Sequence, residues 1–420
     1  MKLNTKSRRF TRIEINLSNL SSNIRVLKSL LASPKTRMMA VVKSNAYGHG
    51  IIEVSKHAVK NGVGALGVVL AEDAIKLRKA GIKVPIYILG EPPLEIVKDA
   101  IKYDFILCLN SPHKAHQVSD ICERFGKKIS VHAKVDTGMN RVGINFRNAI
   151  SEIEEISSFK GIKLDGVFTH FSCAGEPDQA YTEMQWGRFL DVLDKLREKN
   201  IIIPVVHCAN SAAFFRNPGY HLDMVRLGIS IYGCSPFGSG ADSWLESGII
   251  QNLNKLRPVL CLKSRVSFVK NVPPGESVSY GAAFKTARDS IIATVPIGYA
   301  DGYSRLLSNK ASVLINGCFA PLAGNVTMDQ IMVDATDVAD KENIREGTEV
   351  VLVGSCQNSS ASSEGSGTGT DSVQLKNTGI NFQTKNACKI SADYLANLMG
   401  TINYEVLTML KDRIPRVYIY

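Results

Sequence analysis

The sequence predicts an α/β protein in which a (β/α)8 TIM barrel is followed by a mostly β C-terminal domain. Between residues 14 and 248, short apolar runs alternate with segments of helical spacing, which is the pattern of strand–helix units in a parallel barrel. Beyond Gly248 the apolar runs are separated by turn signals such as Pro273-Pro274-Gly275 and Asn316-Gly317, as in a β domain. We therefore expect a barrel over residues 14–248 and a β domain over 249–420, with residues 1–13 as a candidate addition to the β domain.

Local signals justify the barrel elements in chain order. Ser18 can cap a first helix, because its hydroxyl accepts from backbone amides of a first turn. The apolar face of that helix is expected to hold Leu20, Ile24, Leu27 and Leu31. The eight expected strands are residues 38–42, 66–70, 86–89, 105–109, 129–135, 164–169, 205–208 and 224–232.

The second domain is predicted from shorter runs. Residues 357–386 include a stretch of serine, glycine and threonine with almost nothing to bury, so we expect a flexible insertion that is dispensable for chemistry. The expected β-type runs are residues 259–269, 290–295, 312–315, 331–333, 349–353, 402–406 and 417–420.

Composition excludes several classes of function. The 420 residues are 45% hydrophobic, yet no segment approaches the ~20 apolar residues of a membrane helix, so we expect a cytoplasmic protein without a membrane partner. Nine cysteines without Cys-x-x-Cys pairs fit reduced thiols, and we assign no metal. The net charge of +11 is dispersed among acidic residues and has no nucleic-acid motif beside it, so we expect no nucleic-acid partner.

The residues after the expected barrel strands carry the chemistry, because those loops build the site of such a barrel. A lysine amine can form a Schiff base, and Ser211 with the backbone amides near Gly228 and Ile229 can receive a phosphate. Pyridoxal 5'-phosphate fits both ends, although each residue taken singly has an ordinary structural explanation. The gathered residues are Lys43, Tyr47, Lys134, Arg141, His170, Ser211, Arg226, Gly228 and Ile229.

Longer motifs resemble one enzyme family over nearly the whole chain, apart from the extreme N-terminus and residues 357–386. They are Lys43-Ser44-Asn45-Ala46-Tyr47-Gly48-His49-Gly50, Lys134 to Arg141, His207 to Ala212, Val225 to Ile229, Ser279-Tyr280-Gly281, Gly298 to Gly302, Met328-Asp329-Gln330 and Gly400 to Glu405. The sequence resembles the alanine racemases, which are pyridoxal-phosphate enzymes of the barrel type.

The resemblance implies that Lys43 holds the cofactor and acts as one base while Tyr280 acts as the other. Two bases are needed because inversion requires a proton to leave one face of Cα and return to the opposite face. By the same resemblance, His170 contacts both Tyr280 and Arg226. Arg226 hydrogen-bonds the pyridine nitrogen without protonating it, because a guanidinium rarely gives up its proton. The implied catalytic residues are thus Lys43, Tyr280, His170 and Arg226.

The resemblance also assigns the remaining site residues. Cofactor binding falls to Lys43, Tyr47, Arg141, His170, Ser211, Arg226, Gly228, Ile229 and Tyr404. Substrate binding falls to Arg141 and Met328, and the entrance to Tyr299, Asp329 and Tyr404. Lys134 is expected to be carbamylated, giving an anion that positions Arg141, whereas the simpler alternative pairs it with Asp136. A head-to-tail homodimer is implied, in which the β domain of one subunit completes the site of the other.

Alanine racemisation, which supplies D-alanine for peptidoglycan, is the function that the resemblance implies. Departures from the family pattern at Ser44, Asn140, Asn325 and Thr327 leave substrate breadth open, because the last two lie near the family's substrate entrance. A broad-specificity amino-acid racemase is the closest alternative. A decarboxylase with the same barrel and a non-catalytic pyridoxal-phosphate-binding protein fit the motifs less well.

Overall fold

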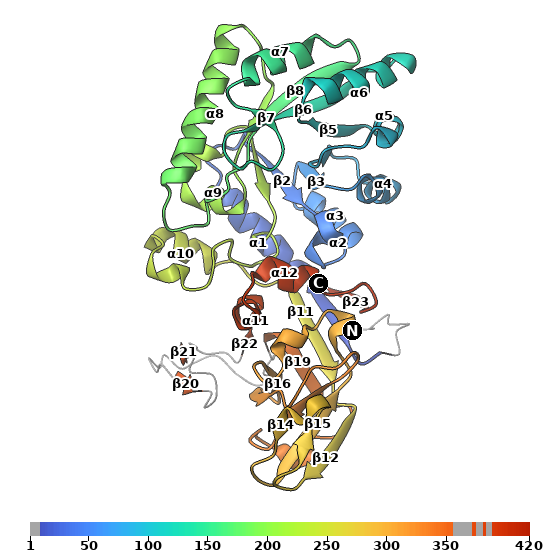
Figure 1. The fold of residues 1–420 in the computed structure, drawn as a ribbon, viewed down its shortest axis with the longest axis vertical. Helices are drawn as coiled ribbons and strands as arrows, with labels where there is room; N and C mark the ends of the chain where they lie inside the picture. Colours follow the sequence, from blue (N-terminus) through green and yellow to red (C-terminus); the bar gives the residue numbers. More distant parts are fainter. Residues whose placement is uncertain (1–8, 356–371, 375–380, 384–388) are drawn as a thin grey trace. The chain divides into compact units, whose positions relative to one another are not determined.

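The computed structural model describes residues 9–355, 372–374, 381–383 and 389–420. The chain divides into two compact units. We call Leu17–Arg257 the barrel unit and the residues up to Asn16 together with Pro258–Tyr420 the β unit. In Figure 1 the barrel unit runs from blue to yellow-green, and the β unit runs from yellow to red apart from strand β1, which is blue.

Eight parallel strands form the core of the barrel unit, and the predicted TIM barrel is confirmed. They pair in the order β10-β2-β3-β4-β5-β6-β8-β9. Between β9 and β10 the backbone amide of Arg226 donates to Ala209 at 3.0 Å and that of Asp223 to Val206 at 3.1 Å, so the ring of strands is nearly closed. The bounds are β2 (Arg37–Val41), β3 (Ala65–Val68), β4 (Ile86–Ile88), β5 (Phe105–Leu109), β6 (Ile129–Asp136), β8 (Ile162–Phe168), β9 (Val205–His207) and β10 (Met224–Leu227), with a short β7 (Ile144–Asn145) beside β6.

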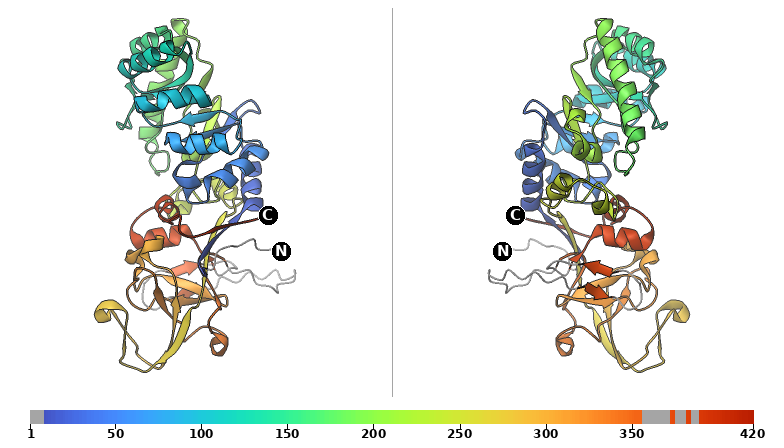
Figure 2. Two further views of the ribbon diagram at one scale, coloured as in Figure 1. Left: turned by 90° about the vertical axis from the view of Figure 1, so that its right-hand side faces the viewer. Right: turned by 90° about the vertical axis from the view of Figure 1, so that its left-hand side faces the viewer.

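Helices surround these strands, as the two turned views in Figure 2 show. The first helix buries Leu20, Ile24 and Leu27 as predicted, but it begins at Leu17 and ends at Ser29. Ser18 therefore lies inside the helix instead of capping it, and Leu31 lies beyond its end. The helices are α1 (Leu17–Ser29), α2 (Lys43–Tyr47), α3 (Ile51–Lys60), α4 (Ala71–Lys79), α5 (Val97–Tyr103), α6 (Pro112–Arg124), α7 (Ala149–Ser158), α8 (Ala180–Glu198), α9 (Ser211–Arg216) and α10 (Ser247–Leu253).

The eighth predicted strand is too long. Residues 224–232 were expected to be extended, but β10 ends at Leu227 and the chain then turns, with the amide of Ile231 donating to Gly228 and that of Tyr232 to Ile229. Ile229, Ile231 and Tyr232 are nonetheless completely buried. The apolar run therefore reflected burial of a tight turn, which periodicity cannot distinguish from a buried strand.

The β unit contains a mixed seven-stranded sheet in which the first and last strands of the chain are neighbours. β1 lies between β11, to which it is antiparallel, and β23, to which it is parallel (Figure 1). The sheet comprises β1 (Arg12–Asn16), β11 (Leu260–Arg265), β16 (Ser312–Ile315), β17 (Cys318–Pro321), β19 (Glu349–Ser355), β22 (Lys389–Ile390) and β23 (Arg416–Ile419).

Smaller sheets and two helices complete the β unit. A three-stranded sheet contains β12 (Phe268–Val272), β15 (Ser290–Val295) and β18 (Ile331–Asp334), and a hairpin contains β13 (Ser277–Val278) and β14 (Phe284–Lys285). The helices are α11 (Ala392–Met399) and α12 (Asn403–Thr408). Much of the predicted insertion, residues 357–386, lies outside the described residues. Its described part is an antiparallel pair, β20 (Ser372–Gln374) and β21 (Asn381–Gln383).

Two predictions for the β unit are wrong in detail. Residues 259–269 form two strands, β11 and β12, which belong to different sheets. Residues 402–406 were expected to be β-type, but they enter helix α12, which buries Asn403, Val406 and Leu407. Buried residues three and four apart indicate a helix, and Leu410 continues this spacing. A run of five residues is too short to show the helical period, whereas the longer segment to Leu410 would have shown it.

Candidate active site

Lys43 begins a left-handed turn at the end of strand β2. The next four residues, Ser44, Asn45, Ala46 and Tyr47, have φ angles of 53°, 54°, 54° and 52°. Such a conformation costs about 1–2 kcal/mol for each residue with a Cβ, so the surrounding structure must impose it. The side chain of Asn45 accepts from the amide of Ile51 at 2.8 Å, which ties the turn to helix α3. Backbone strain of this kind gathers at functional sites.

The amine of Lys43 is poised for nucleophilic chemistry. Desolvation lowers its pKa below the ordinary value of lysine, and the positive charge of Arg141 lowers it further. A lower pKa increases the fraction of neutral amine, which is the form that attacks a carbonyl carbon.

Tyr47, Ser211 and Gly228 form a compact cradle. The amide of Gly228 donates to the hydroxyl of Ser211 at 3.1 Å, and both Ser211 and Tyr47 are buried. Burial raises the pKa of Tyr47, so its phenol keeps its proton and remains a hydrogen-bond donor. Ile229 follows Gly228 in the same turn and is completely buried. The left-handed turn and the turn after β10 therefore meet where the sequence predicted a phosphate site.

Arg226 is a buried cation with several hydrogen-bond partners. Its Nη1 donates to Nδ1 of His207 at 2.8 Å, and its Nη2 donates to Nδ1 of His170 at 3.0 Å and to the carbonyl oxygens of Thr169 and Cys208 at 2.9 Å each. Burial lowers its pKa to about 10, so it is still a guanidinium at neutral pH. Within the described residues, none of these bonds uses Nε, which remains available to another acceptor.

His170 lies at the meeting point of the predicted cations. Burial lowers its pKa well below the usual value of histidine, and the charges of Arg226, Arg141, Lys134 and Lys43 lower it further, in that order. Each of the four charges therefore lies in the neighbourhood of this imidazole, and Arg226 contacts it directly. The structure therefore brings together the predicted residues of the first, fifth, sixth and eighth barrel strands.

Sequence reasoning missed His207 as a functional residue. This histidine is completely buried on β9, and besides accepting from Arg226 it contacts Nδ1 of His132 through Nε2 at 2.9 Å. Its pKa is lowered well below the usual value by burial and by Arg226, so the ring is neutral. The signal that could have found it was its place in the motif His207 to Ala212, opposite the arginine of the next strand.

Lys134 is 3% exposed and lies near the C-terminal end of strand β6. Burial lowers its pKa to about 8, and its amine donates to the carbonyl oxygen of Val142. Asp136 does not pair with it among the described residues. Instead, Oδ1 of Asp136 accepts from the amides of Gly138 at 2.9 Å and Asn140 at 3.1 Å. Asn140 has a φ of 54°, which asparagine tolerates better than most residues.

In the β unit, Asn325 holds the loop that carries Tyr280. Its Nδ2 donates to the carbonyl oxygen of Tyr280 at 2.8 Å, and its own carbonyl oxygen accepts from the hydroxyl of Ser279 at 2.8 Å. Ser279 has a φ of 69°, so this clamp stabilises a strained conformation. Tyr280 is 75% exposed.

The other predicted residues of the β unit lie on adjoining loops. The amide of Tyr299 donates to Thr327 and that of Ala300 to Met328, each at 3.0 Å. Met328 is 55% and Tyr299 43% exposed, and Asp329 follows on the same loop. Tyr404 lies on α12 and is half-buried. All five of these residues belong to the β unit, whereas Lys43, His170 and Arg226 belong to the barrel unit.

The described residues contain neither a membrane-spanning helix nor a cluster of metal-binding side chains. None of the described helices is long and apolar enough to span a membrane. The described part of the chain also contains no group of three or more His, Cys, Asp or Glu side chains that could hold a metal ion.

The chain combines a parallel barrel, which carries Lys43 and the hydrogen-bonded Arg226 at the ends of its strands, with a β domain. This is the architecture of a two-domain barrel enzyme. Two family models match it: the alanine racemase N-terminal domain over residues 15–236 and the alanine racemase C-terminal domain over residues 259–377. The chain belongs to the alanine racemase family.

Individual relatives match along nearly their whole length. The alanine racemase of Halothermothrix orenii is 39% identical over 416 residues, which cover 99% of this chain and 98% of the relative. That of Clostridium novyi is 38% identical, covering 97% and 94%. Among solved structures, alanine racemase from Clostridium difficile 630 has a TM-score of 0.83 at 36% identity, covering 99% and 97%. Alanine racemase from E. faecalis has a TM-score of 0.83 at 32% identity, covering 99% and 100%.

Proposed function

We propose that this protein interconverts L-alanine and D-alanine with two bases, Lys43 and Tyr280, one of which removes the Cα proton while the other delivers a proton to the opposite face. D-alanine made in this way would supply peptidoglycan. The observation that carries the proposal is the hydrogen bond between the buried Arg226 and His170 at 3.0 Å, with the charges of Lys43 and Arg141 in the same neighbourhood. Such a site can bind an anionic cofactor and an amino-acid carboxylate while keeping one amine available as a base.

The barrel residues fit pyridoxal 5'-phosphate, the cofactor of the family. Lys43 offers an amine of lowered pKa for the carbonyl carbon, and the free Nε of Arg226 suits a ring nitrogen. Gly228 lacks the Cβ that would fill the phosphate cradle, since a Cβ there would lie 2.6 Å from the hydroxyl of Tyr47. When bound, the cofactor supplies an electron sink that stabilises negative charge at Cα.

The hydrogen bonds of Arg226 define the role of His170. Arg226 donates to Nδ1 of His170, so this nitrogen is an acceptor, and the proton of the neutral ring must reside on Nε2. His170 can therefore donate from Nε2 to the phenolic oxygen of Tyr280. That bond favours the phenolate, which tyrosine needs in order to act as a base, because its free pKa is about 10.

Two bases on opposite faces account for racemisation. Lys43 takes or returns the proton on one face of Cα, and Tyr280 does so on the other, so the reaction runs in both directions. Arg226 would keep its charge throughout, and it would hydrogen-bond the ring nitrogen of the bound cofactor without protonating it. Arg141 binds the substrate carboxylate, and Met328 contacts the substrate from the β unit.

Lys134 is proposed to be carbamylated. At a pKa of about 8, the buried amine has a substantial neutral fraction near neutral pH, and only the neutral amine reacts with carbon dioxide. The carbamate would be an anion facing Arg141, whereas Oδ1 of Asp136 already accepts hydrogen bonds from two backbone amides. Intact-mass and peptide mapping under bicarbonate should locate the modification on Lys134 and not on the exposed Lys163. An unmodified Lys134 would remove this part of the proposal.

A head-to-tail homodimer would bring Tyr280 to a barrel mouth. Tyr280, Met328 and Tyr299 expose much of their apolar surface in the single chain, and clustered apolar exposure is typical of an interaction surface. In the dimer, the β unit of one subunit would contribute these residues and the entrance residue Asp329 to the other subunit, and Tyr404 would reach the phosphate. A monomer with full turnover at high dilution would contradict this arrangement.

Substrate breadth is the one feature for which a second candidate has support. Asn325 and Thr327 use their side chains within the β unit, Thr327 accepting from the amide of Gln330 at 3.2 Å and donating to its carbonyl oxygen at 2.8 Å. Neither side chain extends as far as the arginine that is common at position 325 in the family. An entrance without that charge favours a broad-specificity amino-acid racemase as the alternative.

Turnover in deuterated water tests the proposal. The purified protein with pyridoxal phosphate should convert L-alanine to D-alanine carrying deuterium at Cα. Exchange with alanine alone supports the narrow specificity, and exchange with a panel of L-amino acids supports the broad one. Bound cofactor without any exchange would support a non-catalytic pyridoxal-phosphate-binding protein and overturn the proposal.

A further inference from the structure

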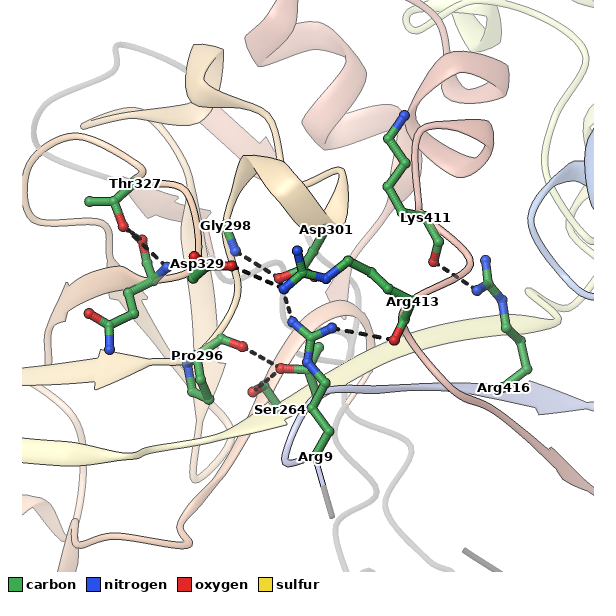
Figure 3. Close-up of polar contacts among 12 residues, drawn as sticks. Arg9, Ser264, Pro296, Gly298, Asp301, Thr327, Asp329, Lys411, Arg413 and Arg416 are labelled. Atoms are coloured by element: carbon green, nitrogen blue, oxygen red, sulfur yellow. Dashed lines mark hydrogen bonds and ion pairs between the residues drawn. The ribbon is translucent and has the colours of Figure 1, made fainter. Parts of the chain in front are cut away.

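The β unit contains a buried carboxylate that none of the proposed steps uses. The side chain of Asp301 is 0% exposed, yet two arginines contact it, Arg9 through Nη2 at 2.6 Å and Arg413 through Nε at 3.0 Å (Figure 3). The amide of Gly298 also donates to it at 3.2 Å. The Arg413 contact is an ion pair without hydrogen-bond alignment, since Oδ1 accepts no hydrogen bond within the described residues. A buried charge is retained only when partners compensate it, and here they come from three separate segments.

Arg413 links this buried carboxylate to an exposed one. While its Nε faces Asp301, its Nη2 donates to Oδ1 of Asp329 at 3.0 Å. Figure 3 shows the guanidinium of Arg413 between the two carboxylates. The position of Asp329 therefore depends on an arginine whose own position depends on Asp301.

Backbone bonds join the same two loops. Tyr299 and Ala300 donate to Thr327 and Met328, and a Cβ on Gly298 would clash with the carbonyl oxygens of both acceptors. On the other side, the amide of Lys411 donates to the carbonyl oxygen of Asp301 at 3.0 Å. Loop 298–302, loop 327–330 and the segment before β23 thus form one hydrogen-bonded assembly.

We propose that Asp301 is a positioning residue for substrate entry, acting through Arg413 to fix Asp329 and, through its own turn, Tyr299. This inference rests on the proposed function, in which Tyr299 and Asp329 form the entrance and Met328 contacts the substrate. Asp301 itself is completely buried and touches no substrate. Its charge holds Arg413 in the orientation that leaves Nη2 for Asp329.

The arrangement requires arginine at position 413. A guanidinium presents several donors in a fixed plane and can face two carboxylates at once, whereas an ammonium is a single point charge on a flexible stem. Arg413→Lys keeps the charge beside Asp301 and thereby the fold, but it gives up the link to Asp329. This variant therefore tests the positioning of Asp329 without removing the charge that stabilises the buried Asp301.

The experiment compares Arg413→Lys, Asp329→Asn, the double variant and Asp301→Asn with the wild-type holoenzyme. Arg288→Lys serves as the control, because Arg288 forms an exposed ion pair with Asp337 elsewhere in the β unit. KM and kcat for L-alanine are measured, together with hydrogen exchange of the Tyr299 and Ala300 amides.

We expect Arg413→Lys and Asp329→Asn each to raise KM about five-fold with kcat unchanged, as coupled residues do, and the double variant to add nothing further. Asp301→Asn should raise KM at least as much and accelerate exchange at both amides. The control should match wild type. Multiplicative KM effects in the double variant, or a fall in kcat with KM unchanged, would overturn the inference.

The amide measurement separates this inference from the proposed function. If the wild-type protein does not racemise alanine, the proposed function fails, yet exchange at Tyr299 and Ala300 still reports whether Asp301 and Arg413 hold the loop. Unchanged exchange in a folded Asp301→Asn protein would contradict the positioning role. If Asp301→Asn does not fold, the KM values of Arg413→Lys and of the double variant alone test the positioning role.

Discussion

Gly228 lies so close to Tyr47 that a Cβ on the glycine would be 2.6 Å from the phenolic oxygen. This contact requires glycine because a real Cβ does not approach an oxygen to that distance. Gly228→Ala should displace the Tyr47 hydroxyl from the cradle and weaken the affinity for pyridoxal phosphate by about ten-fold, which corresponds to ~1.4 kcal/mol. Cofactor titration followed by absorbance measures the affinity.

Gly248→Ala is the matched control for that prediction. Gly248 lies in α10, and nothing lies within 4 Å of a Cβ built on it. Its substitution should leave cofactor affinity unchanged and stabilise the helix slightly. Equal affinities for the wild type and Gly228→Ala would show that the cradle is not the phosphate site.

The lowered pKa of Lys134 predicts that part of the free energy of unfolding depends on pH. Its pKa falls from 10.5 to about 8 in the folded chain, so between pH 8 and 10.5 the unfolded chain binds more protons at this residue. The free energy of unfolding should therefore rise with pH across that window, because the cost of burying a charged amine disappears as it deprotonates.

The variant Lys134→Met isolates this component. In buffers free of carbon dioxide, its advantage in stability over the wild type should be largest below pH 8 and should shrink towards pH 10.5. Urea unfolding at a series of pH values gives the comparison. A difference between the two proteins that stays constant with pH would contradict the lowered pKa of Lys134.

His207 should contribute to stability through Arg226. His207→Leu leaves Nη1 of a buried guanidinium without its acceptor, which should cost about 2–3 kcal/mol of unfolding free energy, whereas His207→Gln keeps an acceptor oxygen and should cost less. Urea unfolding measures both. His116→Leu, at an exposed ion pair with Asp120, should change little. An equal cost for Leu and Gln would show that the hydrogen bond to Arg226 contributes nothing.

The fold was predictable wherever one signal dominated. All eight barrel strands overlap the apolar runs that predicted them, because a parallel strand buried on both faces needs such a run. The eighth run nevertheless continues to residue 232, beyond the end of β10 at Leu227. Two failures have different causes: residues 228–232 are mostly apolar because a tight turn buries them. Residues 402–406 instead include the exposed Ile402 and Glu405, and they bury Asn403 and Val406 on one face of helix α12. Local composition does not distinguish these cases.

The site was predictable in part, because barrel geometry gathers residues that follow the strands. Lys43, His170 and Arg226 were expected to meet, because each lies at or just after the end of a predicted barrel strand and the loops there build the site of such a barrel. His207 was not predicted as a site residue, because its role depends on which neighbouring side chain its ring contacts. The left-handed turn at Ser44 to Tyr47 was not predicted either, since no sequence signal marks four successive residues with Cβ atoms at positive φ.

Mixing two inactive variants tests the central claim that Lys43 and Tyr280 are bases from different subunits of one composite site. Lys43→Ala should lose the absorbance of the lysine-bound cofactor, whereas Tyr280→Phe should keep it, and each should be inactive as a racemase. Co-refolding equal amounts should restore about a quarter of wild-type activity, since half the dimers are mixed and each has one complete site. No recovery, despite mixed dimers seen by native mass spectrometry, would contradict the claim.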